Sequence, residues 1–364
     1  MSMRYEAGIL SATYQPLKTP NAPTVGTATA GSGSLSLTFT APSNVGGGAI
    51  TSFRVYVTNT STGVVTINTG ASSPIVVTGL TNGNAHTAKV SAVNAFGEGP
   101  LSAVSNSATP IVQGQFAYTA AGSYSWVAPS GATSVSVVAV GAGGCGTGAK
   151  QGGGGGGLGY KNNYTVTPDS SYTVVVGTGT SNASGGDSYF VSTGVVKGGG
   201  GQSNGTGGSY TGDGGGTGGA SPNNAGSGGG GAGGYAGTGG AAGAGQASPG
   251  SVGSATSGAG GGGGGGSGSN HEGGGGGGVG IFGQGANGAG STAIHNYGNP
   301  SFYYGYKGQG GSGGTPDAAN TYVGQSNGAY GGGGTDGVPG NGGAVRVIWP
   351  GVSRTFPSTG TADV

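Results

Sequence analysis

The chain has 364 residues, of which 99 are glycine, and its formal net charge at pH 7 is +1. Glycine is concentrated between residues 141 and 345, where it occupies 81 of 205 positions. Collagen is excluded, because unbroken runs such as 152–157 and 273–278 destroy a Gly-X-Y register. Only 5% of the residues are charged, so the composition gives no electrostatic basis for binding nucleic acid or an anionic membrane.

Residues 1–20 are predicted to form an extended arm. They lack the apolar core of a secretory signal, and nowhere does the chain reach the ~18–20 consecutive apolar residues of a membrane span. The arm has mixed polarity and contains Pro16 and Pro20. We expect it to anchor the chain to other proteins of the same assembly, and we expect no membrane insertion.

Residues 21–110 have an ordinary composition and a β pattern. Apolar and polar residues alternate at 34–39 and 52–57, as in half-buried strands. Glycine and asparagine clusters supply turns between the segments. The spacing predicts a β-sandwich with further strands at 63–67, 74–80 and 86–94.

Two stretches within 21–110 resemble the last strands of a fibronectin type III domain. They are Gly79-Leu80-Thr81-Asn82-Gly83 and the sequence VSAVNAFGEGP from Val90 to Pro100. The resemblance implies the fold and says almost nothing about a ligand. Phe39 stands where the family usually has a tryptophan, and we expect it to fill the core. His86 stands at the tyrosine-corner position, so either an imidazole hydrogen bond replaces the phenol bond or the corner is looser.

Residues 111–197 are predicted to form the base of a second β-sandwich. The pattern predicts strands at 116–118, 123–127 and 134–140, two more within 160–177, and a hairpin at 187–197. It returns only at 344–350, inside the closing segment 344–364. Strands on both sides of a glycine-rich insert predict one closed domain that the last strand clamps. The expected core residues are Val135, Val137, Val140, Val174, Val176, Val345, Val347 and Trp349.

The glycine-rich region, 198–343, needs a different source of stability. Ordering glycine costs roughly 0.5–1 kcal/mol per residue more than ordering alanine, and large apolar side chains are sparse here. Polyproline-II geometry has three residues per turn and no internal hydrogen bonds, so its amides point towards neighbouring helices. We therefore predict a packed array of polyglycine-II helices, joined by turns such as 221–226 and 267–273. Disorder is the alternative. The predicted fold class is thus all-β plus polyglycine-II.

The second half also resembles proteins of bacteriophage virions. Residues 126–144, the glycine runs and the closing sequence GGAVRVIWPG (342–351) are similar to glycine-rich domains of phage tail proteins. Some tail-tip adhesins of this kind pack polyglycine helices and select a host receptor with their distal loops. The sequences at 4–13 and 351–364 resemble the ends of structural proteins of marine phages, particularly cyanophages. The chain departs from some adhesins because we identify no tail-docking or chaperone-like domain.

Catalytic, cofactor and metal chemistry find little support in the residue pattern. Gly-x-Gly-x-x-Gly recurs through composition alone, and no Gly-Lys dipeptide completes a phosphate loop. His271-Glu272 has no further ligand at metal-site spacing. The single cysteine, Cys145, has no neighbouring base in the sequence. We expect no enzymatic activity, no cofactor and no metal.

An aromatic loop between residues 296 and 306 is the best candidate for a receptor-binding site. Tyrosine-rich loops on a rigid scaffold make effective recognition surfaces, and rings beside amides suit the faces and hydroxyls of sugars. The alternative is that these rings pack against the glycine array. The candidate residues are Asn296, Tyr297, Asn299, Phe302, Tyr303, Tyr304 and Tyr306.

The expected function is that of a non-enzymatic phage surface fibre or adhesin, located on the tail or the capsid surface. Its partners would be other virion proteins and a host receptor or polysaccharide, and a homotrimer is an alternative to an array formed within one chain. Two other functions stay open. One is a capsid fibre or decoration protein with a structural role only, and the other is a cell-surface or ice-binding polyglycine protein.

Overall fold

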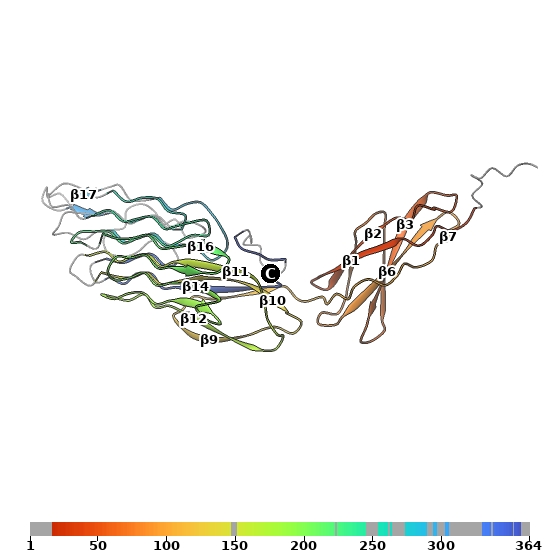
Figure 1. Cartoon of the computed structure of the whole chain (residues 1–364), viewed down its shortest axis with the longest axis horizontal. Coiled ribbons are helices and arrows are strands. Elements are labelled where there is room, and N and C mark those ends of the chain that lie inside the picture. The colour runs from red at the N-terminus through yellow and green to blue at the C-terminus, as the bar shows by residue number, and fades with distance from the viewer. Residues whose placement is uncertain are drawn as a thin grey trace, which may run out of the picture. The chain divides into compact units, whose positions relative to one another are not determined.

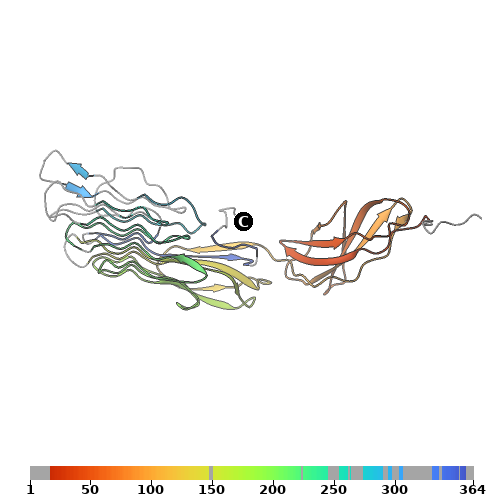
Figure 2. The same ribbon diagram turned by 45° about the horizontal axis from the view of Figure 1, so that its top comes forward.

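The computed structural model describes residues 17–146, 151–222, 224–244, 254–260, 263, 274–289, 294–296, 303–305, 330–335, 338–351 and 353–357. The chain divides into two compact units, Met1–Gln113 and Gly114–Val364 (Figures 1 and 2). Every regular element among the described residues is a β-strand. Within the same residues, no helix has the length and apolar character needed to cross a membrane. Most of the predicted arm, residues 1–16, lies outside the described part.

The first unit is a sandwich of two antiparallel sheets, with the strand orders β1-β2-β5 and β4-β3-β6-β7. In β3 (Ile50–Asn59) the alternation predicted from the sequence buries Phe53, Val55 and Val57, whereas Arg54 is exposed. The other strands are β1 (Thr24–Gly31), β2 (Ser34–Thr40), β4 (Val65–Gly70), β5 (Ile75–Thr78), β6 (His86–Asn94) and β7 (Gly97–Glu98). The sequence TVGTATAG of β1 has no large side chain except Val25, so its pattern gave no strand prediction.

Both unusual residues of the first unit have defined structural roles. Phe39 is buried in the core, with its ring centroid 4.7 Å from that of Phe53, as predicted. His86 is 2% exposed, and its Nδ1 lies 2.8 Å from the carbonyl oxygen of Asn84. The imidazole therefore makes a local hydrogen bond to the backbone, which decides between the two expectations for this position.

The second unit contains two larger antiparallel sheets, with the strand orders β16-β11-β10-β19-β8 and β15-β14-β13-β12-β9. As predicted, the closing strand β19 (Ala344–Trp349) completes the base, because it lies between β10 (Ser134–Val140) and β8 (Gly114–Tyr118). The remaining strands are β9 (Gly122–Val127), β11 (Leu158–Thr165), β12 (Ser171–Val176), β13 (Ser188–Phe190), β14 (Val196–Gly198), β15 (Tyr210–Thr211), β16 (Gly214–Gly216), β17 (Ile294–Asn296) and β18 (Tyr303–Gly305).

Strand β10 is buried along its whole length because both of its faces are covered. Val135 and Val137 pack between the two sheets, together with residues of β12 and β19. Val138 and Val140 pack on the opposite face, against residues of the glycine-rich region such as Ala232 and Val279. The predicted core is therefore buried, with the corrections that Val140 belongs to the second cluster and that Trp349 is only partly buried.

The described glycine segments are held to one another by backbone hydrogen bonds that recur every three residues. Gly153 and Gly156 donate to Gly334 and Gly331, in antiparallel order. Gly154 and Gly157 donate in the same way to Gln202 and Gly199. Among the described residues, segment 153–157 exchanges hydrogen bonds with six neighbours: 141–144, 199–202, residue 208, residue 219, 230–233 and 331–334.

The close packing of these segments leaves no room for side chains. A Cβ atom placed on any residue from Gly153 to Gly157 would lie within 3.0 Å of a neighbouring backbone atom. Extra atoms in a packed interior force the backbone to move. Glycine is therefore required here by the proximity of the chains, and backbone hydrogen bonds take the place of a side-chain core.

Candidate functional site

Strands of the base continue directly into glycine-rich segments, and the chain turns back at the far end of each. Strand β10 leads into 141–145, and 152–157 returns to β11; likewise, β14 leads into 199–201, and 206–209 returns to β15. The turns gather at the end of the unit away from β10 and β11, where Figure 1 also places β17. We call this the loop end, and its described turns are 180–184, 202–206, 221–222 and 224–227.

Side chains fix two of these turns to each other. The hydroxyl of Ser184 donates to Oε1 of Gln202 over 3.2 Å and accepts from the backbone N–H of Ser203 over 3.0 Å. Within the second turn, Oδ1 of Asn204 accepts from the N–H of Thr206 over 3.0 Å. Short polar side chains of this kind stabilise turns by bonding to nearby backbone. The two turns therefore form one connected surface.

The third turn is tied to the array through serine. The N–H of Ser221 donates to the carbonyl of Gly205 over 2.7 Å, and its hydroxyl donates to the carbonyl of Gly228 over 2.8 Å. The hydroxyl of Ser227 accepts from the N–H of Gly152 over 3.1 Å. Both serines are buried. The backbone of this turn is thus positioned by the same glycine segments that carry the other turns.

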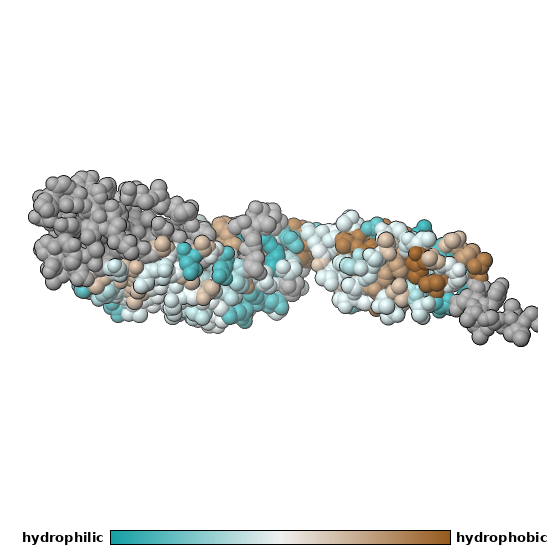
Figure 3. All heavy atoms as spheres, turned by 90° about the horizontal axis from the view of Figure 1, so that it is seen from above, coloured by the Kyte–Doolittle hydropathy of each residue, from teal (hydrophilic) through white to brown (hydrophobic). Residues whose placement is uncertain are grey.

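The described turns of the loop end carry no Asp, Glu, Lys or Arg. Their exposed residues include the amides Asn182, Gln202, Asn204 and Asn224 and hydroxyl residues, together with the small apolar residues Ala183, Pro222 and Ala225. In Figure 3 the described surface of the second unit is mainly white and teal on the face shown, whereas the first unit carries brown patches. Such a surface can donate and accept hydrogen bonds without attracting ions.

The structure describes part of the predicted aromatic site. Strands β17 and β18 pair antiparallel, so that Asn296 lies opposite Tyr303 and His295 opposite Tyr304. Tyr297, Asn299, Phe302 and Tyr306 lie outside the described residues. The hairpin lies near the loop end in Figure 1, and the proposed role of its side chains stays a prediction.

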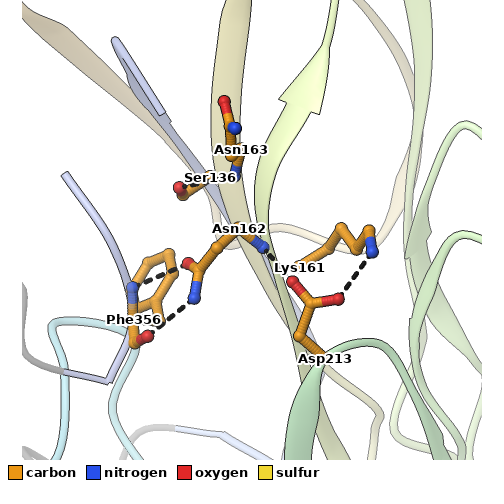
Figure 4. Close-up of polar contacts among 6 residues, drawn as sticks. All are labelled: Ser136, Lys161, Asn162, Asn163, Asp213 and Phe356. Carbon is orange, nitrogen blue, oxygen red and sulfur yellow. Dashed lines mark hydrogen bonds and ion pairs between the residues drawn. The ribbon is translucent and has the colours of Figure 1, made fainter. Parts of the chain in front are cut away.

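The charged residues that the structure describes in the second unit lie outside these turns, and Lys161 and Asp213 among them stabilise the fold. Lys161 Nζ is 2.5 Å from Oδ1 of Asp213, and the N–H of Asn162 donates to Oδ2 over 2.8 Å (Figure 4). Burial alone would raise the pKa of Asp213, but these hydrogen bonds and the Lys161 charge lower it below its usual value. Among the described residues, no group of three or more His, Cys, Asp or Glu could hold a metal ion.

Arg346 is a residue whose role the sequence pattern did not reveal. It is fully buried on β19, where alternation alone placed a charge beside valines. Its Nε donates to Oε1 of Gln115 over 3.0 Å, its Nη1 donates to the carbonyl of Ile281 over 3.2 Å, and its guanidinium lies 4.6 Å from the ring centroid of Phe282. Arg346 thus connects the base to the glycine-rich region.

Comparison with known proteins concerns mainly the first unit. The family model described as "Fibronectin type III domain" matches residues 20–108. A search of curated proteins finds no match. Fibronectin type III domains and all-β folds are typically non-catalytic.

Several solved structures share low similarity with the chain. The twitchin kinase region from C. elegans is 16% identical, over 25% of this chain and 17% of that chain, with a TM-score of 0.24. For the titin kinase with its flanking domains, the identity is 16%, the coverage 44% and 30%, and the TM-score 0.24. The sixth fibronectin type III domain of human fibronectin type III domain containing protein 3 is 22% identical, over 29% of this chain and 95% of that chain, with a TM-score of 0.21. The chain thus spans less than a third of the two kinase-containing chains. On the strength of the family match, residues 20–108 are a fibronectin type III domain.

Proposed function

We propose that the chain is a non-enzymatic surface protein of a bacteriophage virion, a tail fibre or tail-tip adhesin. The fibronectin type III domain acts as a spacer, and the glycine-rich region presents the loop end to a receptor on the host cell. The resemblance of the second half to phage tail proteins supports the virion location. The neutral amides and hydroxyls of the loop end favour a receptor rich in hydroxyl groups, such as a surface polysaccharide.

The observation that carries this proposal is the way the turns of the loop end are held. They are fixed by hydrogen bonds to each other and to a scaffold of glycine backbone. A surface that is ordered before binding loses less conformational entropy when it binds. Exposed side chains of the turns that make none of these hydrogen bonds can differ between related chains without loss of the fold.

We also assign the packed glycine segments to polyglycine-II helices. The three-residue recurrence of their hydrogen-bond partners supports this geometry, because polyproline-II helices have three residues per turn. No glycine in 152–157 or 228–234 has a positive φ, so none of them adopts a turn conformation that requires one. Slow amide exchange at 153–157 is expected, and exchange there at the rate of an unfolded peptide would contradict the assignment.

Binding is tested with the full chain, labelled with a fluorophore, on a panel of bacterial cells and on their purified surface polysaccharides. Replacing Tyr303 and Tyr304 together with alanine is expected to lower cell binding at least about tenfold if the hairpin supplies a recognition hot spot. Tyr210→Ala is the matched control, because Tyr210 is 39% exposed and lies on β15, in the base. Normal cell binding by the double variant would show that the hairpin is not part of the receptor-binding site.

Location is tested separately by immunogold labelling of phage particles that contain the chain. Label on the tail is expected. Label confined to the capsid shell would contradict the tail-fibre assignment, and a chain that labels the capsid without binding any cell would be a decoration protein.

A further inference from the structure

Residues 353–357, which we call the strap, are hydrogen-bonded to two separated parts of the second unit. Arg354 Nη1 donates to the carbonyl of Gly114, the first residue of β8, over 2.6 Å. At the other end of the strap, the carbonyl of Pro357 accepts from the N–H of Gln284 over 2.9 Å. Gln284 belongs to the glycine-rich region, whereas Gly114 belongs to the base. The strap therefore bridges the two.

The centre of the strap is held by one amide side chain. Asn162 on β11 donates from Nδ2 to the carbonyl of Phe356 and accepts at Oδ1 from its N–H, both over 2.8 Å (Figure 4). These two bonds satisfy both backbone groups of Phe356, as a strand partner would. The backbone N–H of Asn162 bonds separately to Asp213, which fixes the residue that carries the amide.

The ring of Phe356 occupies an aromatic slot between the base and the glycine-rich region. It is 3% exposed and stacks on Tyr235, with 5.8 Å between the centroids and 20° between the planes. The ring centroid of Tyr160, on β11, lies 6.3 Å from that of Phe356. The hydroxyl of Tyr235 in turn donates to the carbonyl of Gly280 over 3.3 Å and accepts from the N–H of Gly283 over 3.2 Å. Phe356 thus contacts the residue that organises two glycine-rich segments.

We propose that the strap is a latch that locks the glycine-rich segments 232–237 and 280–284 onto the base and that can open while the base stays folded. Phe356 belongs to the cluster between β10 and the glycine-rich region, whereas the core between the two sheets includes no strap residue. The described strap residues also form no strand. Opening the latch therefore breaks the hydrogen bonds to Gly114 and Asn162 and removes packing from one side of β10, but it leaves the core between the two sheets intact, which makes it a local event.

The latch is tested by amide hydrogen exchange, read by mass spectrometry, on the full chain. Phe356→Ala is expected to speed exchange in 232–237 and 280–284 by roughly tenfold or more, because it empties the slot and frees Tyr235. Asn162→Ala is expected to have a smaller effect on the same segments. Exchange in 134–140 and 172–176, in the base, and in 53–59, in the first unit, should not change.

Phe116→Ala is the matched control, because Phe116 is 52% exposed on β8 and makes none of the strap contacts. It should leave 232–237 and 280–284 protected. In a chain that stops at Gly351, segments 232–237 and 280–284 should lose protection. They should regain it when a synthetic peptide of residues 351–360 is added. Unchanged exchange at 232–237 in Phe356→Ala would overturn the latch, and so would an equal increase at 134–140, since the strap would then be part of a single cooperative core.

Discussion

Glu98 organises the outer face of one sheet of the fibronectin type III domain. Its Oε1 accepts hydrogen bonds from the hydroxyls of Tyr56 and Ser91, each over 2.5 Å, and its Oε2 lies 2.9 Å from Nη1 of Arg54. Burial alone would raise the pKa of Glu98, but the hydrogen bonds from Ser91 and Tyr56 and the Arg54 charge lower it below its usual value. The carboxylate is therefore favoured in the folded domain.

Because its pKa is lower in the folded than in the unfolded domain, Glu98 stabilises the fold above about pH 4.3, its ordinary unfolded value. This contribution is lost as the pH falls through the folded pKa. Glu98→Gln should lower the free energy of unfolding at pH 7 by about 1 kcal/mol and should reduce the loss of stability on acidification. Urea unfolding of the first unit at pH 7 and near pH 3 measures both effects. If Glu98→Gln lost as much stability between pH 7 and pH 3 as the unchanged chain, Glu98 would not be the source of the acid sensitivity.

Arg346 shows how far the sequence could lead at the scale of single residues. The pattern of β19 correctly predicted the burial of Val345 and Val347, which share the core between the sheets. It could not predict that the opposite face is also buried, because the segments that cover it come from remote parts of the chain. A charged residue in an exposed-face position was therefore indistinguishable from a solvated one.

Arg346→Lys is expected to destabilise the second unit by about 2 kcal/mol, because a lysine lacks the planar guanidinium whose separate nitrogens bond to Gln115 and to the carbonyl of Ile281. Denaturant unfolding measures the change. Arg54→Lys is the control, since the Arg54 side chain is 47% exposed and its replacement should matter little. Equal effects of the two substitutions would show that burial of Arg346 contributes nothing.

At the scale of elements, the sequence predicted that backbone hydrogen bonds hold the glycine segments together. It did not predict which segments lie beside one another. Sparse apolar side chains implied backbone hydrogen bonding, and the described segments are bonded in this way. Their sequences are nearly identical, however, so nothing in them specifies which segment pairs with which. The strands of the base resolve this choice, because each fixes the starting point of the segment that continues it. The structure describes a turn at 224–226, inside the predicted turn 221–226, whereas the predicted turn at 267–273 lies outside the described residues.

Gly155→Ala tests whether close packing requires glycine. A Cβ at this position meets the backbone carbonyl of Gly231, so the substitution should cost at least about 1–3 kcal/mol in the stability of the second unit. Gly342→Ala is the matched control, because no atom lies within 4 Å of its added Cβ and its φ is not positive. This control should be neutral or stabilise by up to about 1 kcal/mol. Thermal unfolding compares them, and similar melting temperatures would argue against the packed array.

At the scale of the whole molecule, each unit has its own core. The cluster around Leu37 and Val55 lies in the first unit, and the clusters around Val137 and Val138 lie in the second. The fibronectin domain could be predicted from motifs, because its residues carry a family pattern. The receptor site could not be assigned in the same way, because exposed loop residues have few structural constraints.

Two separate unfolding transitions are therefore expected for the full chain. Phe39→Ala should lower the midpoint of one by removing a buried ring, at a cost of about 3–5 kcal/mol, and Gly155→Ala should lower only the other. Calorimetry on the full chain and on residues 17–113 alone measures this. A single transition that both substitutions shift would show that the units unfold together.

The three-residue recurrence of hydrogen-bond partners also restricts how such a scaffold can change in length. Partners are met at Gly153 and again at Gly156, and likewise at Gly154 and Gly157. An insertion of one or two residues would rotate all later amides towards the wrong neighbours. In the proposed polyglycine-II geometry, growth is compatible with the array only in triplets added to both arms of a glycine hairpin, and each triplet would extend the reach of the loop end by about 9 Å.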